Sequence, residues 1–186
     1  AEGVHIGLCS RTEGEAVETA KALEKEFGVN AHGVKADTTL SKDIDGFIHS
    51  VEEAFGGADI LISNAGGGSM ETIVESNDEG WQYFWDLHVM AAVRLSRGFV
   101  PLMRKRGGGV IITNASICGR RPLSHEPIYN TVKAAVVMLA KCLANEVTKD
   151  NIRVNCVNPG LILTDAWRRG AKIHSKKEGI SPEEYL

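Results

Sequence analysis

Two side chains able to exchange a proton stand four residues apart in the segment YNTVK. At this spacing Tyr129 and Lys133 share one face of a helix, so their side chains are neighbours. A phenol with a pKa of about 10 is a poor base at neutral pH, and lowering that pKa by about three units requires roughly 4 kcal/mol. A cation about 5 Å away supplies roughly 3 kcal/mol at an effective dielectric constant of about 20. The pair suits acid–base chemistry, although exposed amphipathic helices carry the same spacing.

A hydroxyl group that can hold a substrate oxygen lies thirteen residues before Tyr129, at Ser116 in NASICG. This separation lets a loop fold the start of a helix back to the end of a strand. A serine hydroxyl both donates and accepts hydrogen bonds, so it can hold the reacting oxygen while a proton moves. We expect Ser116, Tyr129 and Lys133 to converge.

The elements that must position these residues follow from the apolar pattern. Short β-branched runs alternate with longer segments of helical period, which indicates a parallel sheet wrapped by helices. The expected strands are Val4–Cys9, Ala31–Lys35, Asp59–Ser63, Val110–Asn114 and Ile152–Val157. The expected helices are Glu13–Phe27, Lys42–Phe55, Glu79–Arg106 and Pro127–Lys149. We predict an α/β fold with a doubly wound, Rossmann-type parallel sheet in three αβα layers, as a single domain over residues 1–186.

Polar and glycine-rich segments follow each expected strand. They are SRTEG, ADTT, NAGGG, ASICG and NPGLILT, in chain order. Right-handed crossovers place all these strand ends at one edge of the sheet, where such folds bind ligands. Residues 165–186 are polar and basic, and we expect them to form a mobile substrate lid over this edge.

One usual feature of such a fold is missing from the sequence. A glycine-rich turn normally follows the first strand and holds the cofactor pyrophosphate at a helix N-terminus. Nothing similar precedes Val4. We expect the chain to be a fragment that lacks its first βα unit and its last strand.

The composition argues against several classes of function. With 43% hydrophobic residues, 24% charged residues and a net charge of -3, the chain has no broad field to attract nucleic acid or an anionic membrane. No apolar run of about 18 residues is present to span a membrane. Four separated cysteines in apolar surroundings indicate reduced thiols, with neither a disulfide nor a metal site. We expect a cytoplasmic protein.

The motifs together resemble the short-chain dehydrogenases/reductases over nearly the whole chain. The resemblance rests on NAG at residues 64–66, on Ser116, on YxxxK at Tyr129 and Lys133, and on PGLILT at residues 159–164. It implies hydride transfer between a nicotinamide cofactor and a secondary alcohol or ketone, without a metal. In that family the serine polarises the carbonyl, the tyrosine exchanges the proton, and the lysine lowers the tyrosine pKa and binds the nicotinamide ribose. We carry these catalytic roles to Ser116, Tyr129 and Lys133.

The resemblance also implies cofactor-binding residues. Besides Tyr129 and Lys133 they are Asn64, Ala65, Gly66, Pro159, Gly160, Ile162 and Thr164. The NAG segment would pass along the cofactor, and the PGLILT segment would meet the nicotinamide amide. The alternatives are a loop of small residues that permits close approach and a simple turn after a strand.

The choice of cofactor depends on the end of the first expected strand. An NAD enzyme places an acidic residue there to bind the adenosine ribose, but this chain has Ser10 and Arg11. A guanidinium group suits a 2′-phosphate, so we predict NADP(H) in preference to NAD(H), against the alternative of a solvated arginine. Asp37 with Thr38 matches the acid at the adenine edge and could equally cap the next helix.

His88 departs from the family pattern, which commonly has an asparagine there that holds a water in a proton relay. Histidine also bonds water, and titration near neutrality would alter the pH profile, but a lone helical histidine is more often structural. Arg120 and Arg121 would favour an acidic substrate unless they only line a solvated loop.

The sequence also favours self-association and leaves two rival functions open. The two longest expected helices carry apolar residues beyond one face, which favours a homo-oligomer, a tetramer or a dimer. The rival functions are a sugar-nucleotide epimerase or dehydratase, which also uses YxxxK, and a nucleotide-fold binding protein without catalysis. Substrate identity does not follow from the sequence.

Overall fold

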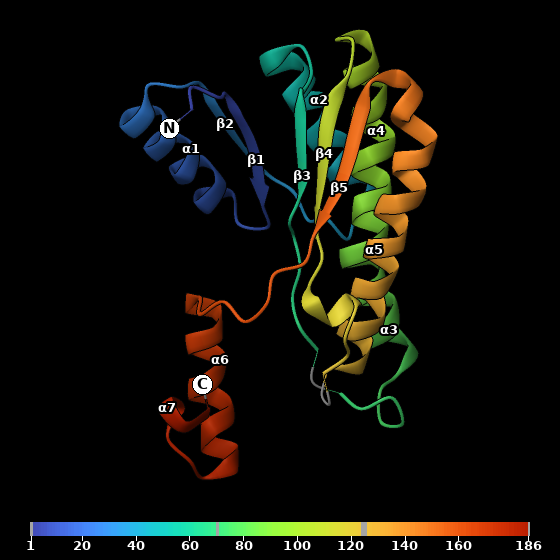
Figure 1. Cartoon of the computed structure of the whole chain (residues 1–186). Coiled ribbons are helices and arrows are strands. Elements are labelled where there is room, and N and C mark those ends of the chain that lie inside the picture. Colours follow the sequence, from blue (N-terminus) through green and yellow to red (C-terminus); the bar gives the residue numbers. More distant parts are fainter. Residues whose placement is uncertain (1, 70, 124–125, 186) are drawn as a thin grey trace.

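Strands and helices alternate along the chain as predicted (Figure 1). The computed structural model describes residues 2–69, 71–123 and 126–185. The strands in this part are β1 (Ile6–Ser10), β2 (Ala31–Lys35), β3 (Ile60–Ser63), β4 (Gly109–Asn114) and β5 (Ile152–Val157). The α-helices there are α1 (Glu13–Phe27), α2 (Ser41–Phe55), α3 (Asp78–Trp85), α4 (Ala91–Lys105), α5 (Pro127–Val147), α6 (Asp165–Glu178) and α7 (Pro182–Tyr185).

The strands are all parallel, but they form two sheets. In the described residues β1 pairs with β2, and β3, β4 and β5 form a second sheet in that order. Residues of β1 and β3 line a shared cavity of about 1670 Å³. The predicted α/β Rossmann-type class is confirmed, with the sheet divided between β1 and β3.

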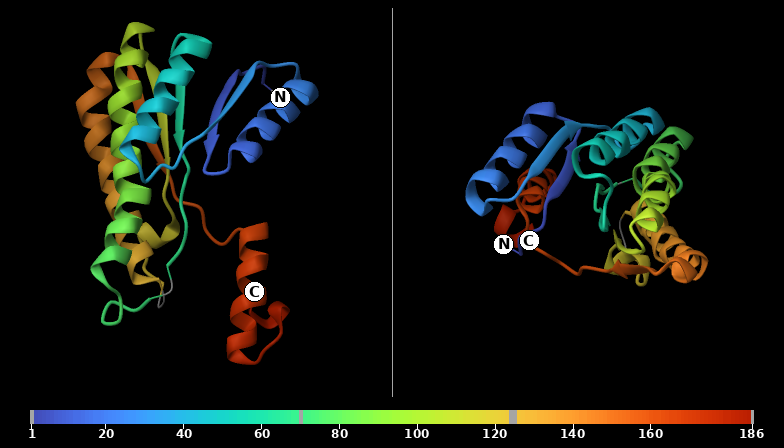
Figure 2. Two further views of the ribbon diagram at one scale, coloured as in Figure 1. Left: turned by 180° about the vertical axis from the view of Figure 1, so that it is seen from behind. Right: turned by 90° about the horizontal axis from the view of Figure 1, so that it is seen from above.

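Helices cover both faces of the β1–β2 pair (Figure 2). A Cβ atom on Gly33 of β2 would lie 2.1 Å from the backbone oxygen of Ala16 in α1. A Cβ atom on Gly7 of β1 would lie 2.8 Å from a methyl group of Val51 in α2. Glycine at these positions lets both helices approach the strands closely, which gives the predicted three-layer arrangement.

The helix expected over Glu79–Arg106 is interrupted, so that prediction is corrected. Between α3 and α4 the chain forms a π-helical turn, η1 (Asp86–Met90). Such turns insert a residue into a helix and are frequent at functional sites. Neither glycine nor proline lies in η1, so the sequence carried no signal for the break.

The main apolar core lies between the second sheet and the helices α2 and α4. Met103 and Ile111 are fully buried at its centre. A second cluster holds the start of α5 against η1 through Ile128, Val132 and Val89. This second cluster fixes the helix that carries Tyr129 and Lys133.

The C-terminal segment expected to be a lid forms helices α6 and α7, which pack against each other. They lie on the side toward which the strands point (Figure 1). Leu186 falls outside the described residues, and the role of the segment as a lid stays a prediction. Among the described residues, every helix is too short or too polar to cross a bilayer.

Candidate active site

Ser116 and Tyr129 are brought together from separate elements. Ser116 follows β4, and its hydroxyl caps the short 3-10 helix η2 (Ile117–Gly119) by accepting from the Cys118 N–H at 3.2 Å. Tyr129 lies in the first turn of α5. The Ser116 side chain lies close enough to the Tyr129 phenol to lower its pKa when taken on its own. The folded loop between β4 and α5 therefore does what the thirteen-residue spacing predicted.

Lys133 lies one turn further along α5 and is 4% exposed. Its Nζ donates to the Asn114 carbonyl oxygen at 2.7 Å and lies 5.4 Å from the centre of the Tyr129 ring. Burial lowers the pKa of Lys133 to about 8. The ammonium group is thus held at the end of β4, beside the tyrosine.

The pKa of Tyr129 is raised, where the sequence argument expected a lowered value. Burial of the half-buried phenol is the largest cause, and electrostatic interactions with Cys118 and Glu126 add to it. The Lys133 ammonium group donates a hydrogen bond to the Asn114 carbonyl oxygen and lies near the Tyr129 ring. Burial therefore sets the direction of the shift, and the lowering of the Tyr129 pKa by Lys133 stays a prediction.

His88 lies in η1 and packs against Tyr129, with the ring centres 5.6 Å apart and nearly perpendicular. Its Nε2 lies 2.9 Å from the Gly67 carbonyl oxygen, while its buried Nδ1 has no hydrogen-bond partner among the described residues. Burial and the charge of Lys133 lower the pKa of His88 to about 4. The imidazole is neutral at pH 7, so the expected titration near neutrality is wrong.

This pKa predicts a pH dependence of stability. His88 titrates at 6.5 in the unfolded chain and at about 4 in the fold, so between these values the unfolded chain binds more protons. Lowering the pH from about 7 to about 5 should therefore reduce the free energy of unfolding by about 2 kcal/mol. Urea unfolding measures the difference, and His88→Asn should remove this part of it. Equal pH dependence in both proteins would contradict a buried neutral imidazole.

The NAGGG loop brings the end of β3 against the same residues. Asn64 Oδ1 accepts from Asn114 Nδ2 at 2.6 Å, which ties β3 to β4. A Cβ atom on Gly66 would lie 2.7 Å from the His88 ring and 3.7 Å from Lys133 Nζ. Only glycine permits this close approach of the loop to the site.

Asn114 was missed by the sequence reasoning. Its carbonyl holds Lys133 and its side chain holds Asn64, so it connects the two motifs. The signal available was a polar residue at the last position of a strand, two residues before Ser116.

The residues expected near the adenosine lie at the ends of β1 and β2. Ser10 donates to the Thr12 carbonyl at 2.6 Å, and Arg11 is exposed. Asp37 accepts from both the backbone N–H and the hydroxyl of Thr39, which lowers the pKa of Asp37. The N-cap of α2 is Leu40, so Asp37 stabilises the turn before the helix.

The PGLILT segment lies beside Ser116 at its first residue only. The Pro159 carbonyl accepts from the Ile117 N–H at 2.9 Å. Further on, Gly160 and Ile162 are exposed, and the Thr164 hydroxyl caps α6 by accepting from the Trp167 N–H. The expected contact of this segment with a nicotinamide stays a prediction.

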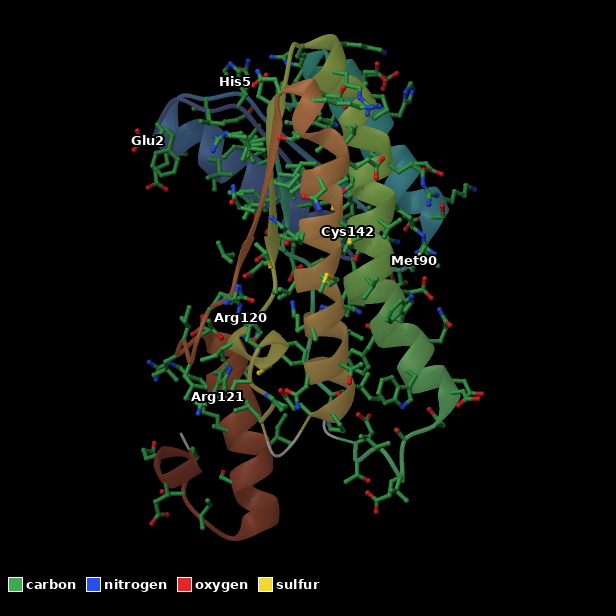
Figure 3. The ribbon with its side chains drawn as sticks, turned by 45° about the vertical axis from the view of Figure 1, so that its right-hand side comes forward. Glu2, His5, Met90, Arg120, Arg121 and Cys142 are labelled. Atoms are coloured by element: carbon green, nitrogen blue, oxygen red, sulfur yellow. The ribbon has the colours of Figure 1, made fainter. Side chains whose placement is uncertain are left out.

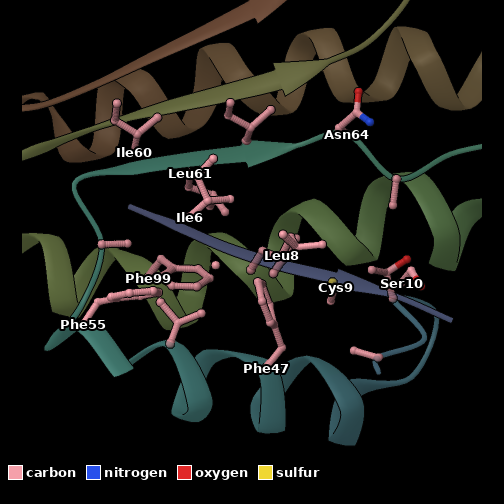
Figure 4. Close-up of a pocket in the computed structure, with 18 of the residues that line it drawn as sticks. Ile6, Leu8, Cys9, Ser10, Phe47, Phe55, Ile60, Leu61, Asn64 and Phe99 are labelled. Atoms are coloured by element: carbon pink, nitrogen blue, oxygen red, sulfur yellow. The ribbon is translucent and has the colours of Figure 1, made fainter. Parts of the chain in front are cut away.

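The cavity between β1 and β3 joins many of these positions (Figure 4). Its floor includes Phe47 of α2 and Phe99 of α4. The predicted cofactor-binding residues that line it are Ser10, Arg11, Thr38, Asn64, Ala65 and Gly66.

No group of His, Cys, Asp or Glu in the described part of the chain could hold a metal ion. Arg120 and Arg121 are exposed after η2 (Figure 3).

Comparison with known proteins finds relatives that belong to one family. Residues 1–173 match the family described as short chain dehydrogenase. Dehydrogenase/reductase SDR family member 4 of Oryctolagus cuniculus is 35% identical over 88% of this chain. The human protein of that name is 32% identical over 96% of this chain. The matched parts span 63% and 66% of those two relatives.

Solved structures agree with this result. L-sorbose reductase from Gluconobacter frateurii, in complex with NADPH and L-sorbose, is 55% identical with a TM-score of 0.95. The alignment covers all of this chain and 70% of that one. Sorbitol-6-phosphate 2-dehydrogenase from Erwinia amylovora is 26% identical with a TM-score of 0.88, over 98% of this chain and 72% of that one.

Proposed function

The chain belongs to the short-chain dehydrogenase family, and we propose that it carries the catalytic part of an NADP(H)-dependent oxidoreductase acting on a polyhydroxy ketone and its alcohol. The observation that carries the proposal is the convergence of Ser116, Tyr129 and Lys133 at the carboxyl end of β4. The 55% identity to an L-sorbose reductase supports the class of substrate and cofactor. Oxidation of NADPH by the full-length protein with L-sorbose tests it, and no oxidation with any ketone would reject it.

The proposed roles of Ser116, Tyr129 and Lys133 follow from which of them carry a proton at neutral pH. A raised pKa keeps Tyr129 protonated at neutral pH, and a protonated phenol donates to a carbonyl oxygen as that oxygen gains negative charge. The Ser116 side chain lies beside this hydroxyl, so the two can hold the same oxygen. Lys133, fixed at Asn114, places a positive charge beside the phenolate that remains.

Residues at one end of the cavity support a dinucleotide site. Arg11, Asn64 and Gly66 line that end, and a side chain at Gly66 would fill the space in front of Lys133. We assign Ser10, Arg11, Asp37 and Thr38 to the adenosine end. The nicotinamide end is assigned to Asn64, Ala65, Gly66, Tyr129, Lys133, Pro159, Gly160, Ile162 and Thr164. When bound, the reduced nicotinamide supplies the hydride.

Preference for NADPH is assigned to Arg11. The guanidinium is exposed at the end of β1 and close enough to Asp37 to lower its pKa. In Arg11→Asp the Kd for NADPH should rise about 10-fold or more relative to that for NADH, because a charge-assisted hydrogen bond to phosphate is lost. Fluorescence titration with both cofactors measures this ratio. Arg120→Asp makes the same charge change elsewhere and should leave the ratio unchanged; an unchanged ratio in Arg11→Asp would contradict the assignment.

The homo-oligomer also stays a prediction. Met138, on α5, is 63% exposed, so apolar surface remains on this long helix for a second copy. A dimer or tetramer is the assembly we propose.

A further inference from the structure

Glu126 lies at the start of α5, three residues before Tyr129, in an unusual conformation. Its φ of 62° is in the left-handed region, which non-glycine residues adopt uncommonly. It is the N-cap residue of α5, yet its side chain makes no capping hydrogen bond to the described helix. An acidic N-cap residue ordinarily uses its carboxylate for that bond. Here the carboxylate is directed elsewhere.

The carboxylate lies over the NAGGG loop. A Cβ atom on Gly68 would be 2.5 Å from Glu126 Oε1, so the third glycine of that loop leaves room for this oxygen. The next residue, Ser69, accepts a hydrogen bond from the Tyr129 N–H at 3.3 Å. The carboxylate, the loop and the first turn of α5 therefore form one side of the site.

The charge of Glu126 does not assist the removal of a proton from Tyr129. It contributes to the raised pKa of Tyr129, because a second negative charge disfavours the phenolate. A carboxylate beside the reacting group also repels phosphate and carboxylate groups on a substrate. It accepts strong hydrogen bonds from hydroxyl groups, which a polyhydroxy ketone carries next to its carbonyl.

We infer that Glu126 is a specificity-determining residue, whose carboxylate accepts hydrogen bonds from the hydroxyl groups of a polyhydroxy ketone held against Tyr129. This inference rests on the proposed function and adds the residue that selects the substrate. It also assigns a preference for uncharged sugars over phosphorylated ones, which the exposed Arg120 and Arg121 alone would not indicate.

The test compares two ketones in the full-length protein. Glu126→Gln keeps the shape and removes the charge, so kcat/KM for L-sorbose should fall about 10-fold or more relative to kcat/KM for 2-butanone. Glu79→Gln removes the same charge from an exposed position on α3 and should leave the ratio unchanged. An unchanged ratio in Glu126→Gln would overturn the inference.

A second variant separates recognition from folding. Glycine adopts the conformation of residue 126 without strain, so Glu126→Gly should fold without backbone strain at this position while losing the preference for L-sorbose. A variant that melts lower and keeps the preference would assign Glu126 to folding and reject our inference. Failure of the wild type to oxidise NADPH with either ketone would instead reject the proposed function.

Discussion

Replacing Tyr129 with phenylalanine is expected to lower kcat/KM by about 10²- to 10⁴-fold, the usual contribution of a general acid. The variant removes only the hydroxyl that faces Ser116. The ring remains to pack against His88, 5.6 Å away, and below the Lys133 ammonium. Steady-state oxidation of NADPH with L-sorbose measures the loss.

Two controls belong to the Tyr129→Phe experiment. The variant should unfold at a similar temperature, because the hydroxyl contributes little to the fold. Its Kd for NADPH is measured separately, so that weaker cofactor binding is not counted as a loss of proton transfer. A variant that keeps wild-type activity would show that Tyr129 does not donate the proton. The YxxxK spacing would then belong to an ordinary helix, and another group would have to supply the proton.

The substitution Lys133→Met is the second change that we expect to lower kcat/KM strongly. Methionine has similar length, so the buried site stays filled while the charge beside the phenolate is lost. We expect kcat/KM to fall by about 10²-fold or more, because the ammonium stabilises the negative charge that develops on Tyr129. Lys141→Met changes an exposed lysine on the same helix and should retain activity. Equal activity of the two variants would remove Lys133 from the mechanism.

Lys133→Met should also change how the free energy of unfolding depends on pH. Lys133 titrates at about 8 in the fold and at 10.5 when unfolded, so between these values the unfolded chain binds more protons. The free energy of unfolding of the wild type should rise through this contribution as the pH increases from 8 to 10.5. Lys133→Met should lack this rise. Denaturation at both ends of the range distinguishes the two proteins.

Local sequence signals predicted most of the elements. The bounds of α1, β2 and β5 agree with the sequence expectation, and α1 ends where Gly28 adopts the left-handed conformation. The break at η1 could not be predicted, because it depends on how Leu87, His88 and Val89 become buried against neighbouring elements. The division of the sheet also depends on which strands meet in space, and strand patterns do not report that.

Spacing predicted which chemical groups meet, but not their proton states. Ser116 and Tyr129 converge as expected, since the loop length between β4 and α5 is readable from the chain. The pKa values of Tyr129 and His88 depend on burial by residues distant in sequence. Likewise, Glu126 gave no motif, because its importance lies in a backbone angle and in its position over Gly68.

The most direct test of hydride transfer follows deuterium from nicotinamide carbon 4 of labelled NADPH into the product made from L-sorbose by the full-length protein. Mass spectrometry should find one deuterium in the product for each NADP⁺ formed, bound to the carbon that was the carbonyl. An unlabelled product, or a product formed without net oxidation of NADPH, would contradict the account and favour the epimerase or dehydratase alternative.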